Sequence, residues 1–299
     1  MTIAACYVSA EGVVLGADST STVYVPGPPG VEGSTHHFDF AQKVFEFGED
    51  SSIGIVTWGL GSLKDTSHRT VIAEVADTCN GDPGSISSVE QVARRFAEHF
   101  HRIYTTRYED VLRQARQLRD KGDERTQEED NDYERIISHL PAGFCLGGWW
   151  PGQRSPAAFE VFVDPLAEAP PDPKPIPQGV ARFWGCPNLM DRLILGLDYQ
   201  VFHTILASGK WHGTAEELLD TIDPNRLAQP FDLPIREAID WIHASIYTTI
   251  KVMKFSHLPP VCGGVVEVAV VTSDRKFRWV SHKRMSEAIP GVPALRKDP

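Results

Sequence analysis

Cysteine is scarce in this 299-residue chain, which has only five cysteines and no CxxC pair. Because the cysteines are odd in number and widely spaced, the sequence predicts neither a disulfide framework nor a zinc site. Long apolar runs are also missing. None reaches the ~18 residues that a membrane-spanning helix needs, and the amino terminus lacks the basic start and apolar core of a signal peptide. We therefore expect a cytoplasmic protein with no membrane partner and with reduced, mostly buried thiols.

Positive charge is in short supply as well. The chain has 29 Lys and Arg residues against 40 Asp and Glu residues, a formal net charge of -11 at pH 7. Phosphate groups are bound mainly by Lys and Arg, so this balance argues against a nucleic-acid partner. The adjacent histidines His36 and His37 have no further ligand at metal-site spacing, and we expect them to be polar loop residues. The sequence predicts no metal and no cofactor.

What the sequence does contain is a series of apolar patterns typical of strands and helices. Helices are expected from about Ser62, from a capped start at residues 87–90, and over residues 190–206 and 235–255. Strands are expected over residues 3–8, 13–17, 43–47, 52–58, 142–150, 158–163, 179–184, 265–272 and 277–280. This order favours an α+β fold in which two antiparallel sheets pack face to face between helix layers, a four-layer αββα sandwich.

Three segments interrupt the pattern and are expected to be loop insertions in a single domain spanning residues 1–299. Residues 25–38 are rich in proline and glycine, which disfavour regular structure. Residues 117–135 are dense in charge, which is typical of a solvated helix end or a mobile excursion. Residues 164–177 are rich in proline. No internal repeat or change in composition indicates a second domain.

Five short motifs, taken together and in order, carry a resemblance to a known family. They are Thr2-Ile3-Ala4, Gly12-Val13-Val14-Leu15-Gly16-Ala17-Asp18-Ser19, Gln42-Lys43-Val44-Phe45, Trp58-Gly59-Leu60-Gly61 and Cys262-Gly263-Gly264-Val265-Val266. With these motifs the chain resembles the β-subunits of proteasomes and the bacterial heat-shock peptidase that shares their fold. Both belong to the N-terminal-nucleophile (Ntn) hydrolases. Asp18 follows Thr2 by 16 residues, as the two-strand hairpin of that family requires.

The resemblance implies that Thr2 is the nucleophile once Met1 has been removed. A threonine hydroxyl must lose its proton to a base during attack, and a free α-amine, with a reference pKa of about 7.7 to 8.0, is such a base. By resemblance, Lys43 stabilises the threonine oxygen, Asp18 pairs with Lys43, and the backbone N–H of Gly59 supplies the oxyanion hole. The resemblance also implies a substrate pocket that accepts a small apolar side chain. Its lining would include Thr20, Ala41, Phe45, Thr57 and Gly61.

Several supporting positions depart from the family pattern. The D-x-x-S-G-G run of the family reads Pro-Pro-Val-Cys-Gly-Gly here, with Pro259 at the aspartate and Cys262 at the serine. Cys186 stands at a second serine position, and Thr20 replaces an arginine. A thiol is a weaker hydrogen-bonding group than a hydroxyl, and proline cannot replace a carboxylate. These departures predict weaker hydrogen bonding around the α-amine than the family pattern provides.

Three functions stay open on these residues. The first is a threonine-type peptidase or amidase that acts within a homo-oligomeric, ring-shaped assembly on peptides or unfolded proteins, with an unidentified ATP-dependent unfoldase as a further partner. The second is a catalytically inactive scaffold subunit of such a ring. The third is an Ntn amidase or acylase that acts on a small-molecule amide.

Overall fold

The first of two large sheets is built on the amino-terminal hairpin. The computed structural model describes residues 2–25, 33–81, 86–227, 232–257 and 261–283. In it β1 (Ile3–Val8) and β2 (Gly12–Ala17) pair antiparallel, and every residue of both strands is buried. The sheet has the order β12-β1-β2-β13-β14. Its other strands are β12 (Ala181–Gly185), β13 (Glu267–Thr272) and β14 (Arg275–Ser281).

The second sheet is also five-stranded and antiparallel, with the order β11-β10-β9-β6-β5. Its strands are β5 (Val44–Glu46), β6 (Ile53–Gly59), β9 (Ala142–Trp150), β10 (Gln153–Val163) and β11 (Lys174–Pro175). The apolar runs at 3–8 and 142–150 become strands with the predicted bounds, because both are covered on two faces and so carry an almost continuous apolar sequence.

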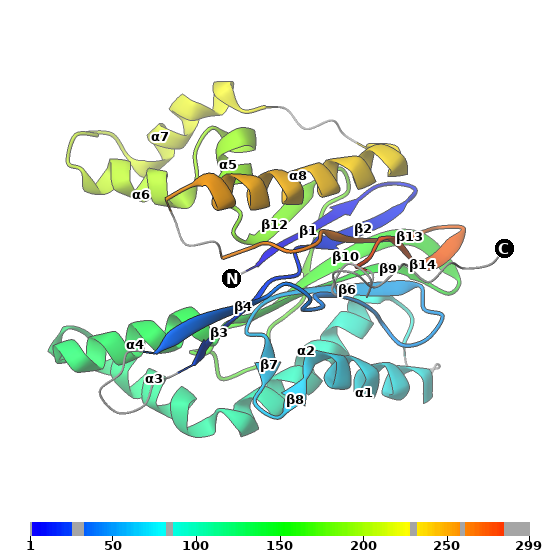
Figure 1. Ribbon diagram of the computed structural model, residues 1–299, viewed down its shortest axis with the longest axis horizontal. Helices are drawn as coiled ribbons and strands as arrows, with labels where there is room; N and C mark the ends of the chain where they lie inside the picture. The colour runs from blue at the N-terminus through cyan, green and yellow to red at the C-terminus, as the bar shows by residue number, and fades with distance from the viewer. Residues whose placement is uncertain (1, 26–32, 82–85, 228–231, 258–260, 284–299) are drawn as a thin grey trace, which may run out of the picture.

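The two sheets pack on each other, and helices cover their outer faces (Figure 1). Between the sheets, Cys6 and Leu15 of the first contact a buried cluster that includes Val56 and Cys145 of the second. On the outer face of the second sheet lie α1 (His68–Gly81) and α2 (Val89–Arg107). On the outer face of the first lies α8 (Ile235–Phe255). The layers therefore run helix, sheet, sheet, helix.

Glycine permits the close approach of α8 to the first sheet. A Cβ atom at Gly16 of β2 would lie 2.7 Å from side-chain atoms of both Ile242 and Ile246. Because Gly16 has no side chain, the two isoleucines of α8 fill the space above β2, the strand that leads to Asp18.

The charge-dense segment 117–135 is helical, which agrees with the interpretation as a solvated helix end, whereas the mobile excursion and the loop insertion are wrong. It is occupied by the end of α3 (Glu109–Lys121), the short 3₁₀ helix η2 (Gly122–Glu124) and the start of α4 (Gln127–His139). Thr126 and Glu129 form a reciprocal capping box, in which each side chain accepts a hydrogen bond from the backbone N–H of the other. The cap and the buried face of α3 stabilise a segment whose composition suggests solvent exposure alone.

The prediction that 25–38 is a loop is also wrong in part. β3 (Ser21–Val25) and β4 (Ser34–Phe38) form an antiparallel hairpin, and residues 26–32 lie outside the described part of the chain. His36 and His37 therefore lie on a strand, where the ring of His36 is hydrogen-bonded to Ser34 and the ring of His37 to Thr22. Segment 164–177 contains only the two-residue strand β11, in agreement with its loop assignment.

Two helical predictions need adjustment, and two short helices were not predicted. A short hairpin of β7 (Ser62–Leu63) and β8 (Thr66–Ser67) precedes α1, which begins later than predicted. Segment 190–206 is two helices, α5 (Asn188–Leu195) and α6 (Tyr199–Ala207), because Gly196 adopts a left-handed conformation that ends the first. The sequence reading missed α7 (Ala215–Ile222) and the 3₁₀ helix η3 (Asp223–Asn225).

Candidate active site

The carboxylate of Asp18 accepts four hydrogen bonds close to the start of β1. Asp18 follows β2 directly and is fully buried. Oδ1 accepts hydrogen bonds from the Ile3 N–H at 3.1 Å and from Lys43 Nζ at 2.7 Å. Oδ2 accepts from the N–H groups of Thr20 at 3.2 Å and Gly263 at 2.9 Å. The carboxylate thus ties together β1, the start of β5 and the glycine pair before β13.

Lys43 is almost completely buried, which is unusual for a lysine, and Asp18 is its ion-pair partner. Burial lowers the pKa of Lys43, while the charge and hydrogen bond of Asp18 oppose that shift. An isolated ammonium would be costly at this depth, so the carboxylate is what keeps a cation in place here. The sequence-predicted pairing of Asp18 with Lys43 is present.

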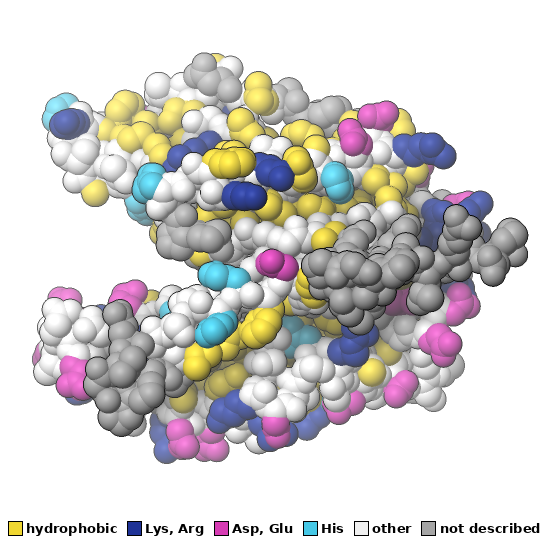
Figure 2. All heavy atoms as spheres, viewed as in Figure 1, with side chains coloured by type: hydrophobic (Ala, Val, Ile, Leu, Met, Phe, Trp, Pro, Cys, Tyr) yellow, Lys and Arg dark blue, Asp and Glu magenta, His cyan; other side chains and the backbone are white. Residues whose placement is uncertain are grey.

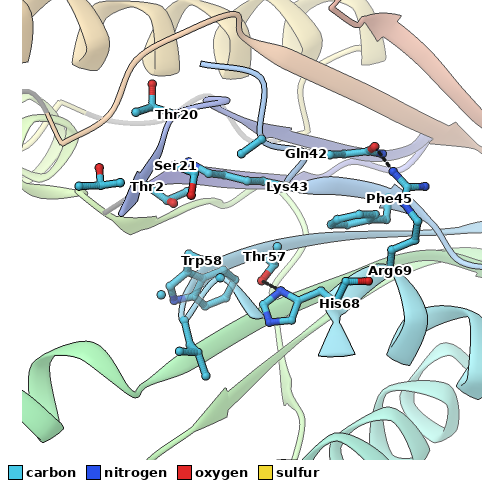
Figure 3. A pocket seen from close by; sticks show the side chains of 16 residues that line it. Thr2, Thr20, Ser21, Gln42, Lys43, Phe45, Thr57, Trp58, His68 and Arg69 are labelled. Carbon is cyan, nitrogen blue, oxygen red and sulfur yellow. Dashed lines mark hydrogen bonds between the residues drawn. The ribbon is translucent and has the colours of Figure 1, made fainter. Parts of the chain in front are cut away.

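Thr2 and Lys43 line one cavity of about 310 Å³. Figure 2 shows that the molecule is hollowed on the side of the β3–β4 hairpin, and Figure 3 shows the lining side chains. In Figure 3, Thr2 and Thr20 lie on one side of Lys43, while Phe45 and Arg69 lie on the other. The cavity is lined by Thr2, Thr20, Ser21, Thr22, Ala41, Gln42, Lys43, Phe45, Thr57, Trp58, Gly59, Leu60, Gly61, Ser67, His68 and Arg69.

This lining brings together most of the sequence-predicted site. Besides Thr2 and Lys43, it contains Gly59 and all five residues expected to contact substrate, which are Thr20, Ala41, Phe45, Thr57 and Gly61. These residues come from positions 2 to 61 along the chain, and the two sheets gather them at one end of the sandwich. Asp18 does not line the cavity and acts from behind Lys43.

Gly59 lies at the end of β6, where glycine is required. Its φ is +78°, and a Cβ atom there would overlap the carbonyl oxygen of Pro141. The neighbouring Leu60 N–H donates to the same Pro141 carbonyl at 2.8 Å. This turn exposes the Gly59 backbone at the cavity, next to Trp58, whose ring stacks on Trp184 of the first sheet at a centroid distance of 4.4 Å.

Cys186 and Cys262 stand beside the ion pair and outside the cavity lining. Their thiols are hydrogen-bonded to each other, which lowers the pKa of Cys186 and raises the pKa of Cys262. Both also interact electrostatically with Lys43. The two thiols form a pair at positions where the sequence resemblance predicts hydroxyl groups. Pro259 lies outside the described residues.

Sequence reasoning missed the part of the lining contributed by the start of α1. Ser67, His68 and Arg69 reach the cavity because the β7–β8 hairpin turns the chain back toward β6. The Arg69 guanidinium donates to Gln42 Oε1 and lies over the Phe45 ring, 5.4 Å from its centroid. The hairpin that places these residues is local, but their position at the cavity also depends on contacts with Gln42 and Phe45, which are distant in the sequence.

His68 is neutral at the bottom of this region. Thr57 Oγ1 donates to the Gly143 carbonyl at 3.1 Å, so the 3.3 Å contact with His68 Nδ1 makes that nitrogen the donor. Among the described residues His68 Nε2 has no partner, and the ring packs edge-on against Phe100 and Phe144. Burial lowers the pKa of His68 from 6.5 to about 4.

This buried histidine predicts a loss of stability in acid. The unfolded chain takes up a proton near pH 6.5, whereas the native His68 resists protonation down to a pKa of about 4. Its contribution is complete above pH 6.5 and is lost as the pH falls toward 4. Between pH 7 and 4.5, urea unfolding should show the wild type losing roughly 2 kcal/mol more than His68→Gln. The exposed His212 provides the control, and an equal loss in His68→Gln and His212→Gln would contradict this account.

The described residues hold no group of three or more His, Cys, Asp or Glu side chains arranged for a metal ion. In the same part of the chain, no helix has the length and apolar character to cross a bilayer. What the cavity offers is a hydroxyl near the amino terminus, a buried ammonium, a buried carboxylate behind it, and an exposed glycine turn. Comparison with models of known protein families and with curated protein sequences gives no match for this chain.

Proposed function

We propose that this chain is an Ntn hydrolase of proteasome-like fold, a threonine-type peptidase or amidase whose nucleophile is Thr2 after removal of Met1. One observation carries the proposal. The buried Lys43–Asp18 pair lies in and behind the same cavity that Thr2 lines, at the amino-terminal end of the chain. The two antiparallel sheets between helix layers support the finer assignment of an Ntn fold.

A buried ion pair of this kind is a poor device for stability, because desolvation of the two charges offsets most of their attraction. It is a good device for acyl transfer, where a fixed cation stabilises the negative charge that develops on the attacking oxygen. Three backbone N–H groups hold Asp18 by hydrogen bonds, and Asp18 in turn holds the Lys43 ammonium at the cavity wall. The ion pair thus has the desolvation cost that is typical of a functional site, and it supplies the fixed positive charge that acyl transfer needs.

In the proposed reaction, the α-amine of Thr2 accepts the proton of the Thr2 hydroxyl as Oγ1 attacks the carbonyl carbon of the scissile amide. The Lys43 ammonium stabilises the attacking oxygen, and the Gly59 N–H donates to the tetrahedral oxyanion. The α-ammonium group then gives its proton to the leaving nitrogen, and the amine product departs. The acyl group remains bound to Thr2 Oγ1 as an ester. Water then hydrolyses the ester, again with the α-amine as base.

Covalent labelling tests this proposal. An epoxyketone peptide forms one bond to the threonine oxygen and one to the adjacent free amine, so it reports both groups at once. We expect one adduct per chain, located on Thr2 by peptide mass mapping, and none in Thr2→Ala. Labelling that persists in Thr2→Ala would exclude Thr2 as the nucleophile.

The thiol pair favours a second candidate, an inactive scaffold subunit of the same fold. Cys186 and Cys262 cannot hydrogen-bond the amine as strongly as hydroxyls would. The double variant Cys186→Ser/Cys262→Ser separates the two candidates. If the chain is an active enzyme, the wild type forms the Thr2 adduct with both cysteines in place. If it is an inactive scaffold subunit, the wild type forms no adduct, and the adduct appears only in the double variant. Hydrolysis of a small amide but not of peptides would instead identify an amidase or acylase.

We propose in addition that the chain works in a homo-oligomeric ring. The β3–β4 hairpin exposes apolar side chains next to the cavity, including Val23, Val25 and Phe38, and burial in an assembly would cover them. Sedimentation velocity distinguishes a ring from a monomer of 33.2 kDa.

A further inference from the structure

We infer that the cavity beside Thr2 binds an acidic side chain of the substrate, a glutamate or aspartate on the acyl side of the cleaved bond, and that Arg69 selects it. The inference rests on the proposed function and adds a substrate class to it. It replaces the small apolar preference expected from the sequence.

The first argument is the charge of the lining. Among the described residues that line the cavity, Lys43 and Arg69 are the only Lys or Arg residues, and none is Asp or Glu. The chain as a whole has a net charge of -11, so the positive sign of the charged lining residues is opposite to that of the whole chain. Asp18 and Asp39 lie outside the lining, where Asp18 pairs with Lys43 and Asp39 accepts from the Thr20 hydroxyl at 3.0 Å. A cationic substrate group next to Arg69 would therefore meet repulsion there.

The second argument is that the charge of Arg69 is not neutralised. Lys43 has Asp18, but within the described ranges Arg69 makes no ion pair with a carboxylate, and its hydrogen-bond acceptor is the neutral amide of Gln42. Arg94 and Arg113, elsewhere on the surface, each pair with two carboxylates. Arg69 thus brings a net positive charge to the cavity that the protein itself leaves available.

The third argument is orientation. Gln42 accepts a hydrogen bond from one nitrogen of the guanidinium, and the Phe45 ring lies beneath the guanidinium, so these two contacts hold the exposed Arg69 side chain at the cavity wall (Figure 3). A guanidinium has five N–H donors in a planar fork that matches a carboxylate, and only one nitrogen is used by Gln42. Because the fork is already ordered, little rotamer freedom is lost when a carboxylate binds.

The remaining wall combines polar and apolar groups, the latter from Ala41, Phe45, Trp58 and Leu60. Thr20, Ser21, Thr22, Thr57 and Ser67 contribute hydroxyl groups to the lining. Most of these hydroxyls already have partners within the protein, since Thr20 donates to Asp39, Thr57 donates to the Gly143 carbonyl, and Ser67 is hydrogen-bonded to Thr70. The preference for an acidic side chain therefore depends on Arg69 and not on the hydroxyl groups.

The test uses the full chain and a matched set of epoxyketone peptides that differ only in the residue next to the reactive group, which is Glu, Gln, Leu or Lys. The rate of Thr2 adduct formation is followed by intact mass. We expect the Glu probe to react roughly tenfold or more faster than the Gln probe, which has the same shape without the charge. Arg69→Gln should bring that ratio close to one, Arg69→Lys should keep part of it, and Arg69→Glu should favour the Lys probe.

Lys64→Gln is the matched control. Lys64 is another exposed cation of the same region, it contacts the Tyr108 ring, and it does not line the cavity, so its loss should leave the Glu to Gln ratio unchanged. Faster reaction with the Leu or Lys probe in the wild type, or a ratio that survives Arg69→Gln, would overturn the inference and leave Thr2 as the nucleophile. Absence of an adduct with every probe would overturn the proposed function together with the inference.

Discussion

Replacing Asp18 with alanine is expected to destabilise the protein by roughly 3–5 kcal/mol, because it leaves the buried ammonium of Lys43 without its counter-ion. The same change removes the acceptor of three backbone N–H groups, those of Ile3, Thr20 and Gly263. Unpaired buried donors add to the cost. Urea unfolding at pH 7 measures the difference from the wild type.

Two controls make this result specific. Asp172 pairs with Arg94 at 2.6 Å on the surface, so Asp172→Asn should change the free energy of unfolding by less than about 1 kcal/mol. The double variant Asp18→Ala/Lys43→Met removes the orphaned charge and should recover part of the loss. A single Asp18→Ala variant as stable as the wild type would contradict the assignment of a buried ion pair.

The second large effect is expected at Gly185, which lies directly opposite Ile3 in the pairing of β12 with β1. Its φ is +80°, and a Cβ atom there would overlap the carbonyl oxygen of Thr2. Gly185→Ala must therefore move β12 or Thr2 itself. We expect a loss of about 3 kcal/mol or more in unfolding free energy and a strongly reduced rate of Thr2 labelling.

Gly209 separates the two causes of that loss. It also has a positive φ, +67°, but a Cβ atom there would meet nothing within 4 Å. Gly209→Ala should cost only the backbone strain, about 1–2 kcal/mol, and leave labelling unchanged. If the two variants lost equal stability and both kept the wild-type labelling rate, the close approach of Gly185 to Thr2 would have no functional meaning.

Much of the architecture follows from local apolar patterns. The bounds predicted for residues 3–8, 142–150 and 235–255 coincide with those of β1, β9 and α8. These elements are long and strongly patterned, so the period of their apolar residues identifies them without tertiary information. The Asp18–Lys43 contact needed the family resemblance, because no local rule brings together two residues on separate hairpins.

The failures have physical causes that can be named. α4 was not predicted as a separate helix because the charge density of 117–135 is typical of a solvated helix end or a mobile excursion, although Thr126 and Glu129 form a capping box that is readable in the sequence. β4 was missed because the proline and glycine content of 25–38 outweighed the strand character of 34–38. Arg69 carried no signal at all, since its place at the cavity depends on the β7–β8 hairpin and on contacts with Gln42 and Phe45.

The central claim is that Thr2 becomes the first residue of the working protein. The measurement that tests it most directly is the intact mass of the chain after expression at low level without an added tag, checked by sequencing from the amino terminus. A mass lower than that of the full sequence by one methionine, with a free amine on threonine, is the predicted result. Retention of Met1 throughout the folded, assembled protein would contradict it, because the amine of Thr2 would then be an amide and could not serve as the base.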